Sequence, residues 1–236
     1  MLGNANLLDV DTQDVAVTYP WLVASAFSAD PQIVAWTGAT QFPYPSWQSD
    51  KLATIFPASI PQLWHESIAG NASSQANLSA WIPQVVVLAG GANDFHQDPP
   101  VTPMDDWVAQ YISFIRQVQS TYGGSLTSIV VVAWSRAQLD VPLPDNQTQN
   151  YLRYQAALAQ AIQEQGLSGA HFLQLTADGM PLTGWCAAHP NRGAHANIAG
   201  QIEGFLQQQA SGWASATFQA TVELSAASFG PVTNAG

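Results

Sequence analysis

The fold is decided by the stretch Val85-Val86-Val87-Leu88-Ala89-Gly90-Gly91-Ala92-Asn93-Asp94-Phe95. Its first four residues are apolar and mostly β-branched without alternation, a pattern typical of a strand covered on both faces of a parallel sheet. The two glycines permit a sharp turn where this strand stops. Asn93 and Asp94 then follow at the carboxyl end, where open α/β sheets place ligands. The stretch alone is equally compatible with an Asx turn that has no chemical role.

Apolar periodicity working outward from this stretch predicts strands that alternate with helices. We expect strands at 32–36, 85–88, 128–134 and 171–175, short helical pieces within 51–67, and helices at 19–27, 105–120, about 149–165 and 194–209. This alternation is typical of a three-layer α/β domain with a mainly parallel sheet. The domain is predicted to span residues 1–212. Residues 213–236 break the pattern and are interpreted as either an added edge strand or a frayed tail.

Composition narrows the class of protein. A chain of 236 residues with 47% hydrophobic and 9% charged residues fits one globular domain. Its net charge of −11 predicts repulsion from nucleic acid and from anionic membranes. No apolar run reaches the roughly 18 residues that a membrane span needs. Cys186 is the only cysteine, so no disulfide forms within this chain.

Three N-x-Ser/Thr sequons begin at Asn71, Asn77 and Asn146, each in a stretch interpreted as a loop. Together with the scarcity of lysine, they predict a secreted, glycosylated protein. Residues 1–6 have neither the basic nor the apolar region of a signal peptide. Two interpretations stay open: a cytosolic protein, or a true N-terminus that lies upstream of this sequence.

Three positions carry residues suited to catalysis. The Asn93 amide, held at a strand end, can donate to a developing oxyanion. Gly38 follows the predicted strand 32–36, and a glycine there lets its backbone N–H approach a substrate. His189 precedes Pro190, which restricts the histidine to an extended conformation and makes it a candidate general base. Asp94 is interpreted as a brace for its turn.

Two alternatives to this assignment involve the second histidine of the region. His195 is another candidate base, although the pattern places it at the start of the last helix. His189 and His195 together resemble half of a metal site, but no third ligand has suitable spacing, so neither a metal nor a cofactor is expected.

In this order, the three positions resemble the motifs of the SGNH (GDSL-type) hydrolases, and most of all carbohydrate esterase family 2, which deacetylates plant polysaccharides. The matching motifs, spread over about residues 3 to 210, are Tyr19-Pro20, Ala35-Trp36-Thr37-Gly38, Gly91-Ala92-Asn93-Asp94-Phe95 and Cys186-Ala187-Ala188-His189-Pro190. The resemblance implies a three-layer α/β/α, flavodoxin-like SGNH domain. It also implies that Gly38 and Asn93 form an oxyanion hole, and that His189 is the base, with Cys186 beside it.

The sequence departs from the family pattern at several points. The nucleophile block, Gly-Asp-Ser, is missing, and we expect Met1 to be an internal methionine of a longer protein whose first strand precedes it. Ser135 is the nearest substitute, but it lacks the strained turn of a nucleophile. The usual Asp near the base is also absent, since Cys186 lies three residues before His189; the resemblance allows a Ser-His dyad. Thr40 replaces the second glycine of the family's block two.

The resulting expectation is a secreted serine esterase that removes O-acetyl groups from an acylated carbohydrate. The missing serine would attack the acyl carbon, and His189 would carry its proton. Tyr44, Trp47 and Trp185 are predicted either to stack on sugar rings or to pack in the protein. This chain is predicted to be inactive and poorly soluble, because the missing strand leaves an open sheet edge. The alternatives are a non-catalytic glycan-binding protein with the same shell, and a lipase or phospholipase that differs only in substrate.

Overall fold

The computed structural model describes residues 14–35, 39–42, 59–68, 71–95, 100, 102–139, 144–181 and 189–209, and the statements below concern these residues. Their centre is a parallel sheet of β1 (Val85–Leu88), β2 (Ser128–Ala133) and β3 (Ala170–Gln174), in the order β1-β2-β3. Val87 is in register with Val130, and Val131 with Phe172. The predicted parallel sheet is therefore confirmed.

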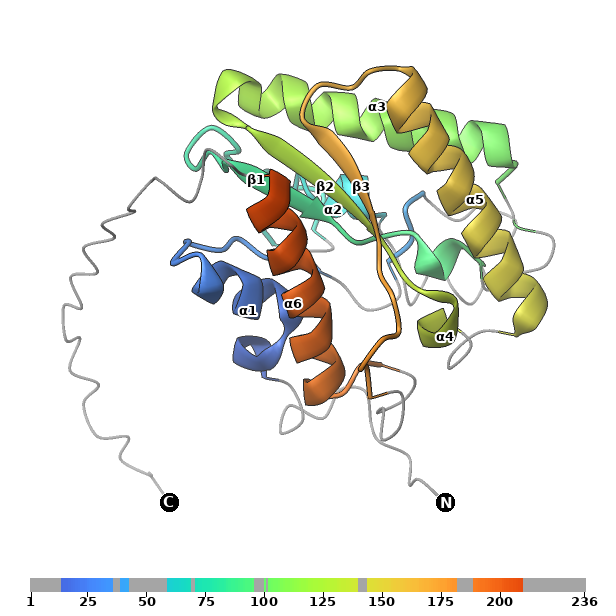
Figure 1. Cartoon of the computed structure of the whole chain (residues 1–236). Helices are drawn as coiled ribbons and strands as arrows, with labels where there is room; N and C mark the ends of the chain where they lie inside the picture. The colour runs from blue at the N-terminus through green and yellow to red at the C-terminus, as the bar shows by residue number, and fades with distance from the viewer. Residues whose placement is uncertain are drawn as a thin grey trace, which may run out of the picture.

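Helices cover both faces of this sheet (Figure 1). α3 (Met104–Tyr122) and α5 (Asp145–Glu164) pack together on one face, and α1 (Tyr19–Ala26) and α6 (Arg192–Gln209) on the other. The three-layer α/β/α architecture predicted from the sequence is confirmed. None of the described helices is long and apolar enough to cross a bilayer. The remaining elements are η2 (Val15–Val17), α2 (Ile60–Leu63), η4 (Ala92–Phe95), η5 (Gly123–Ser125) and α4 (Arg136–Leu139).

The central strand β2 shows why its sequence does not alternate. Ile129 and Val131 point into the core beneath α3 and α5, whereas Val130 and Val132 point into the core beneath α1 and α6. All four side chains are at most 1% exposed. Because both faces are covered, every position along this strand favours an apolar residue.

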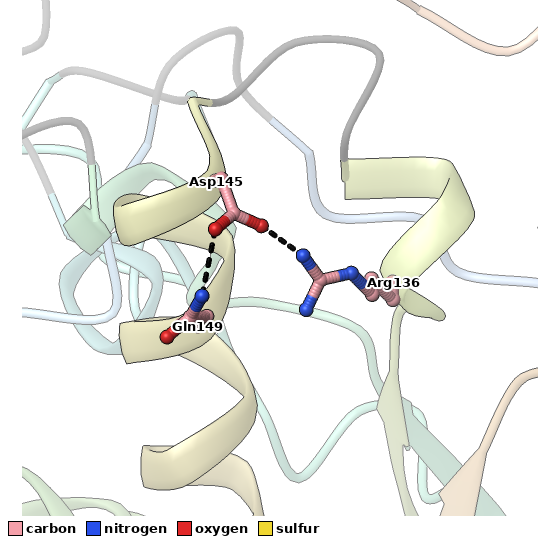
Figure 2. Close-up of polar contacts among 3 residues, drawn as sticks. All are labelled: Arg136, Asp145 and Gln149. Atoms are coloured by element: carbon pink, nitrogen blue, oxygen red, sulfur yellow. Dashed lines mark hydrogen bonds and ion pairs between the residues drawn. The ribbon is translucent and has the colours of Figure 1, made fainter.

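The first turn of α5 is stabilised by side chains, as Figure 2 shows. The Asp145 carboxylate pairs with the Arg136 guanidinium of α4 and accepts a hydrogen bond from Gln149 Nε2 at 2.7 Å. Asp145 also suits the positive end of the helix dipole. With these contacts in its first turns, α5 begins at residue 145, directly after Pro144 and four residues before the predicted start.

The earlier start of α5 corrects the interpretation of one sequon. Asn146 lies in the first turn of α5 rather than in a loop, and Thr148 of that sequon is fully buried. Asn71 and Asn77 are exposed and lie outside helices and strands, as predicted.

The strand predicted at 32–36 is not formed within the described residues 31–35. Ile33 and Val34 are instead 37% and 42% exposed. A strand requires ladder hydrogen bonds to a neighbour, and among the described residues β1, an edge strand, pairs with β2 alone. Apolar β-branched residues at 33 and 34 have the correct composition for a strand but carry no information about a partner.

Candidate active site

The turn after β1 is the structural base of the candidate site. Gly91 has φ of +102°, and a Cβ atom there would lie 3.0 Å from the Trp107 ring. Only glycine adopts this conformation readily, and only glycine fits this close to the indole. The chain then forms the short helix η4, which includes Asn93 and Asp94. The predicted turn at the carboxyl end of β1 is confirmed.

Asn93 and Asp94 both bind the segment 39–42, which follows the predicted oxyanion glycine in the sequence. Asn93 Nδ2 donates to the Ala39 carbonyl at 2.9 Å. The Asp94 carboxylate accepts from the backbone N–H groups of Gln41 at 2.8 Å and of Phe42 at 3.3 Å. These bonds join two motifs that lie more than fifty residues apart in the chain.

The environment of Asp94 changes its acid strength. Burial raises the pKa of its carboxyl group from the ordinary 3.8 to about 7. The N–H groups of Gln41 and Phe42 and the Trp107 side chain stabilise the carboxylate and lower the pKa, but by less than burial raises it. The group therefore changes charge near neutral pH, next to the amide proposed as an oxyanion donor.

His189 and Asn93 line the same cavity, which has a volume of about 720 Å³. Ala39 and Tyr19 line it as well. His189 is exposed, so its imidazole is accessible to solvent and to a ligand. The structure thus places two of the predicted site residues along one cavity, which also extends along the whole of β1.

His195 is held by other contacts. Its Nδ1 accepts the Tyr19 backbone N–H at 3.3 Å, and its ring stacks on the Tyr19 ring with centroids 5.8 Å apart. Burial, together with the neighbouring His189, lowers the pKa of His195. A neutral imidazole with an accepting Nδ1 carries its proton on Nε2. His195 therefore fastens α6 to α1 and is less suited than His189 to accept a substrate proton.

The structure describes only some of the other predicted residues. Gly38 and Cys186 lie outside the described residues, as do Tyr44, Trp47 and Trp185. Ser135 is only 8% exposed and exchanges hydrogen bonds with Gln138, donating its N–H to Oε1 at 2.6 Å and accepting the Gln138 N–H on Oγ at 3.3 Å. This is the geometry of a cap for α4 rather than of a nucleophile. No group of three potential metal ligands occurs within the described part of the chain.

The segment 39–42 contributes contacts that sequence reasoning missed. Thr40 is buried, and its hydroxyl donates to the Phe42 carbonyl. The carbonyl of Ala39 and the backbone N–H of Gln41 position Asn93 and Asp94. No sequence pattern identifies such partners, because they act through backbone atoms that every residue type carries.

Comparison with known proteins agrees with this architecture. The model of the GDSL-like lipase/acylhydrolase family matches residues 28–201. Comparison with curated proteins gives no significant match. Among solved structures, a carbohydrate esterase described as having an active site with divergent catalytic and non-catalytic binding functions is similar, with 21% identity and a TM-score of 0.64. A family two carbohydrate esterase from Clostridium thermocellum in complex with cellohexaose has 18% identity and a TM-score of 0.62.

The similarity to the two solved structures extends over most of this chain but over little more than half of each structure. Each of the two structures covers 86% of this chain, whereas this chain spans 57% of the length of either. At such low identity the likeness establishes the fold. The family model covers well over half of the chain and contains β1, the Asn93 turn and His189. On this basis, the chain belongs to the GDSL-like lipase/acylhydrolase family.

Proposed function

We propose that this chain forms most of the active site of a serine esterase that removes acetyl groups from carbohydrate hydroxyls. The observation that carries the proposal is the shared cavity of Asn93 and His189, with Asn93 fixed by the Ala39 carbonyl. An amide donor and an accessible imidazole beside one cavity are two of the parts that acyl transfer to serine requires.

In the proposed reaction each of these residues has a defined role. A serine from a segment that precedes residue 1 attacks the acetyl carbonyl carbon while His189 accepts the serine proton. The Asn93 amide and the Gly38 N–H hold the oxyanion. The carbon–oxygen bond to the sugar breaks, and His189 returns the proton to the sugar oxygen. Water then attacks the acetyl-serine, again with His189 as the base, which releases acetate and restores the serine.

The substrate class is proposed from two considerations. The family comprises lipases and acylhydrolases, which makes an ester the scissile group. A structure of the same fold was obtained with cellohexaose bound, which favours a carbohydrate as the remainder of the substrate here.

The test compares two proteins on 4-nitrophenyl acetate and on acetylated xylan. The 236-residue chain is expected to show no turnover above the buffer rate. A chain extended at its N-terminus by an apolar strand and Gly-Asp-Ser is expected to hydrolyse both, and to lose activity when that serine is replaced by alanine. Turnover by the unextended chain, or none by the extended one, contradicts the proposal.

Variants of the extended chain assign the roles. His189→Ala and Asn93→Ala are each expected to lower kcat by about a hundredfold or more, as loss of a base or of one oxyanion donor does. His65→Ala is the matched control, because the His65 imidazole contacts Trp64 and Gln117 and does not itself line the cavity. Its kcat should stay within about twofold, and a His189→Ala variant that kept full kcat would remove the histidine from the mechanism.

A non-catalytic carbohydrate-binding protein is the second candidate. The capping role of Ser135, which leaves no evident replacement nucleophile there, favours it. Calorimetry with acetylated xylo-oligosaccharides separates the two: binding by the extended chain without release of acetate supports this second function.

A further inference from the structure

Asn93 and Asp94 hold neighbouring backbone groups of one other segment of the chain. Asn93 Nδ2 donates to the Ala39 carbonyl at 2.9 Å. The Asp94 carboxylate accepts the N–H of Gln41 at 2.8 Å and that of Phe42 at 3.3 Å. The two side chains are therefore linked through this segment as well as through their own peptide bond.

We propose that Asp94 is a positioning residue of the oxyanion hole: its carboxylate fixes the segment 39–42, and the Ala39 carbonyl of that segment fixes the Asn93 amide. The effect on catalysis rests on the proposed function, because that function makes Asn93 an oxyanion donor. The structural part, in which Asp94 controls the orientation of the Asn93 amide, holds or fails without any reaction.

The contacts of the Asp94 carboxylate favour action on the other segment over action on its own turn. Each oxygen accepts one N–H of that segment, Oδ2 from Gln41 and Oδ1 from Phe42. These two bonds lower the pKa of Asp94 more than the bond from its own backbone N–H does. The interpretation of Asp94 as a brace for its own turn is thus extended, since its stronger bonds join that turn to another part of the chain.

The Ala39 carbonyl determines the orientation of the Asn93 amide. The side-chain amide of an asparagine has two N–H donors. With one hydrogen directed at Ala39, the direction of the other is set. Stabilisation of an oxyanion requires donors that are oriented before the reaction. The contribution of Asn93 to catalysis therefore depends on the position of the Ala39 carbonyl.

The chemistry of the carboxylate makes this position sensitive to Asp94. Gln41 is 1% exposed and Ala39 is 4% exposed, so the segment lies away from solvent. Hydrogen bonds to a carboxylate are roughly twice as strong as those between neutral groups. In Asp94→Asn, one oxygen is replaced by an NH₂ group, which would face a backbone N–H as donor against donor. The segment is then expected to shift and to carry the Ala39 carbonyl with it.

Other contacts keep the segment in place as a whole when Asp94 is changed. The Thr40 carbonyl accepts the N–H of Ile60, at the start of α2, at 2.9 Å. The Phe42 ring lies edge-on to the Trp107 ring, with centroids 6.0 Å apart. Neither contact involves Asp94. A substitution there should accordingly displace the segment without unfolding the protein.

The first experiment measures the order of the Asn93 amide by NMR in the isotopically labelled 236-residue chain. A pH of about 7.5 keeps the Asp94 carboxyl mainly ionised, because its pKa is about 7. A NaCl concentration of about 0.05 M preserves the repulsion between chains. The order parameter of Asn93 Nδ2 should be about 0.85 in wild type and below about 0.6 in Asp94→Asn.

Two matched controls exclude a general loosening of the protein. Asn197 Nδ2 also donates to a backbone carbonyl, that of Asp178 at 3.0 Å, and its order parameter should be the same in wild type and in Asp94→Asn. Asp106→Asn is the same substitution at an exposed position in α3 and should leave the Asn93 amide unchanged. Urea unfolding checks that both variants are folded.

The second experiment uses the chain extended by Gly-Asp-Ser, with 4-nitrophenyl acetate as substrate. Asp94→Asn should lower kcat about tenfold and keep KM within about twofold, because it disturbs a contact made in the transition state. A double-mutant cycle with Asn93→Ala then identifies the path of the effect. In the Asn93→Ala background, Asp94→Asn should lower kcat by less than about twofold, since the amide that it positions is gone.

The proposal is overturned if the Asn93 order parameter is the same in wild type and in Asp94→Asn, or if Asn197 loses as much order as Asn93. A full tenfold loss of kcat in the Asn93→Ala background overturns it as well, because Asp94 would then act by another path. Absence of turnover by the extended chain contradicts the proposed function alone. The order parameter of Asn93 then still decides whether Asp94 positions the amide.

Discussion

The titration of Asp94 makes the stability of the protein depend on pH. Its carboxylate accepts two backbone N–H groups of the segment 39–42, yet burial raises its pKa to about 7. Because this value lies above the ordinary 3.8, the folded protein binds a proton more tightly than the unfolded chain. Its contribution to the free energy of unfolding is complete below about pH 4 and is lost as the pH rises through 7.

Replacing Asp94 with asparagine should remove this dependence. In the wild-type chain the Asp94 contribution falls by up to about 4 kcal/mol between pH 4 and pH 8. Asp94→Asn keeps one oxygen acceptor without the charge, so its stability relative to wild type should increase with pH over this range. Urea unfolding at several pH values measures the difference. Asp106→Asn, at an exposed position in α3, is the control, and its free energy of unfolding should change with pH as that of wild type does. If the free energy of unfolding of Asp94→Asn also changed in that way, the Asp94 carboxyl would not titrate near pH 7.

His195 makes the free energy of unfolding depend on pH with the opposite sign. Its pKa is lowered by burial and by His189, so the folded protein disfavours the imidazolium. The stability contributed by the neutral ring is present above about pH 6.5 and is lost as the pH falls through the lowered pKa. Protonation of Nδ1 would also replace the acceptor that binds the Tyr19 N–H.

His195→Phe tests this role because it keeps an aromatic ring beside Tyr19 but removes the acceptor. We expect a loss of about 1–2 kcal/mol in unfolding free energy at pH 7.5, the cost of an unsatisfied N–H, and a smaller further loss at pH 5 than in wild type. His65→Ala removes an imidazole that contacts Trp64 and Gln117 without touching the contact between His195 and Tyr19, and it is the control for loss of a histidine side chain. An unchanged acid response in His195→Phe would assign that response to other groups.

At the scale of elements, glycines with different surroundings should respond in opposite directions. Gly91→Ala would force an alanine into φ of +102° and place its Cβ 3.0 Å from Trp107. We expect a loss of about 1–3 kcal/mol. Gly200→Ala, in the middle of α6 with open space around it, should instead raise stability by about 0.5–1 kcal/mol. Thermal and urea unfolding of both variants measure these changes, and a neutral Gly91→Ala would mean that the turn relaxes without cost.

The sequence was most informative where one residue pattern had one structural solution. Continuous apolar runs predicted β1 and β2, because such a run suits a strand that helices cover on both faces. The Gly-Gly turn and Asn93 followed from the end of that strand. The pattern was wrong at the described residues 32–35, where strand formation depends on a neighbour rather than on composition. It was late at α5, whose first turn follows Pro144 and is linked to α4 by the Arg136–Asp145 pair, a tertiary contact.

The site was predictable only in part for a related physical reason. Residue types with distinctive chemistry, such as Asn93 and His189, could be selected from motif and spacing. The partners that hold them are backbone groups of Ala39, Gln41 and Phe42, which have no signature in sequence. Likewise, the sequence favoured His189 over His195 but could not show the contact of His195 with Tyr19.

At the scale of the whole molecule, two features act in opposite directions on association between chains: the net charge, and the edge of β1 that pairs with no strand among the described residues. Chains with net charge −11 repel one another, while unpaired strand edges associate. We expect the 236-residue chain to self-associate, and to do so more strongly as NaCl rises from about 0.05 to 0.5 M, because salt screens the repulsion but not edge pairing. Sedimentation velocity at both salt concentrations measures this. A monomer that unfolds cooperatively under all these conditions would contradict the expectation.

The burial of Trp107 gives the molecule an internal optical probe. Its indole is 1% exposed, lies against Gly91 and contributes to the environment of the Asp94 carboxyl. A charge that appears and disappears beside an indole shifts the energies of its excited states, so fluorescence can report the titration of Asp94. The difference between the emission of wild type and of Trp107→Phe isolates this signal from the other tryptophans. The turn that carries Asn93 and Asp94 can thereby be followed in solution by light, without a substrate.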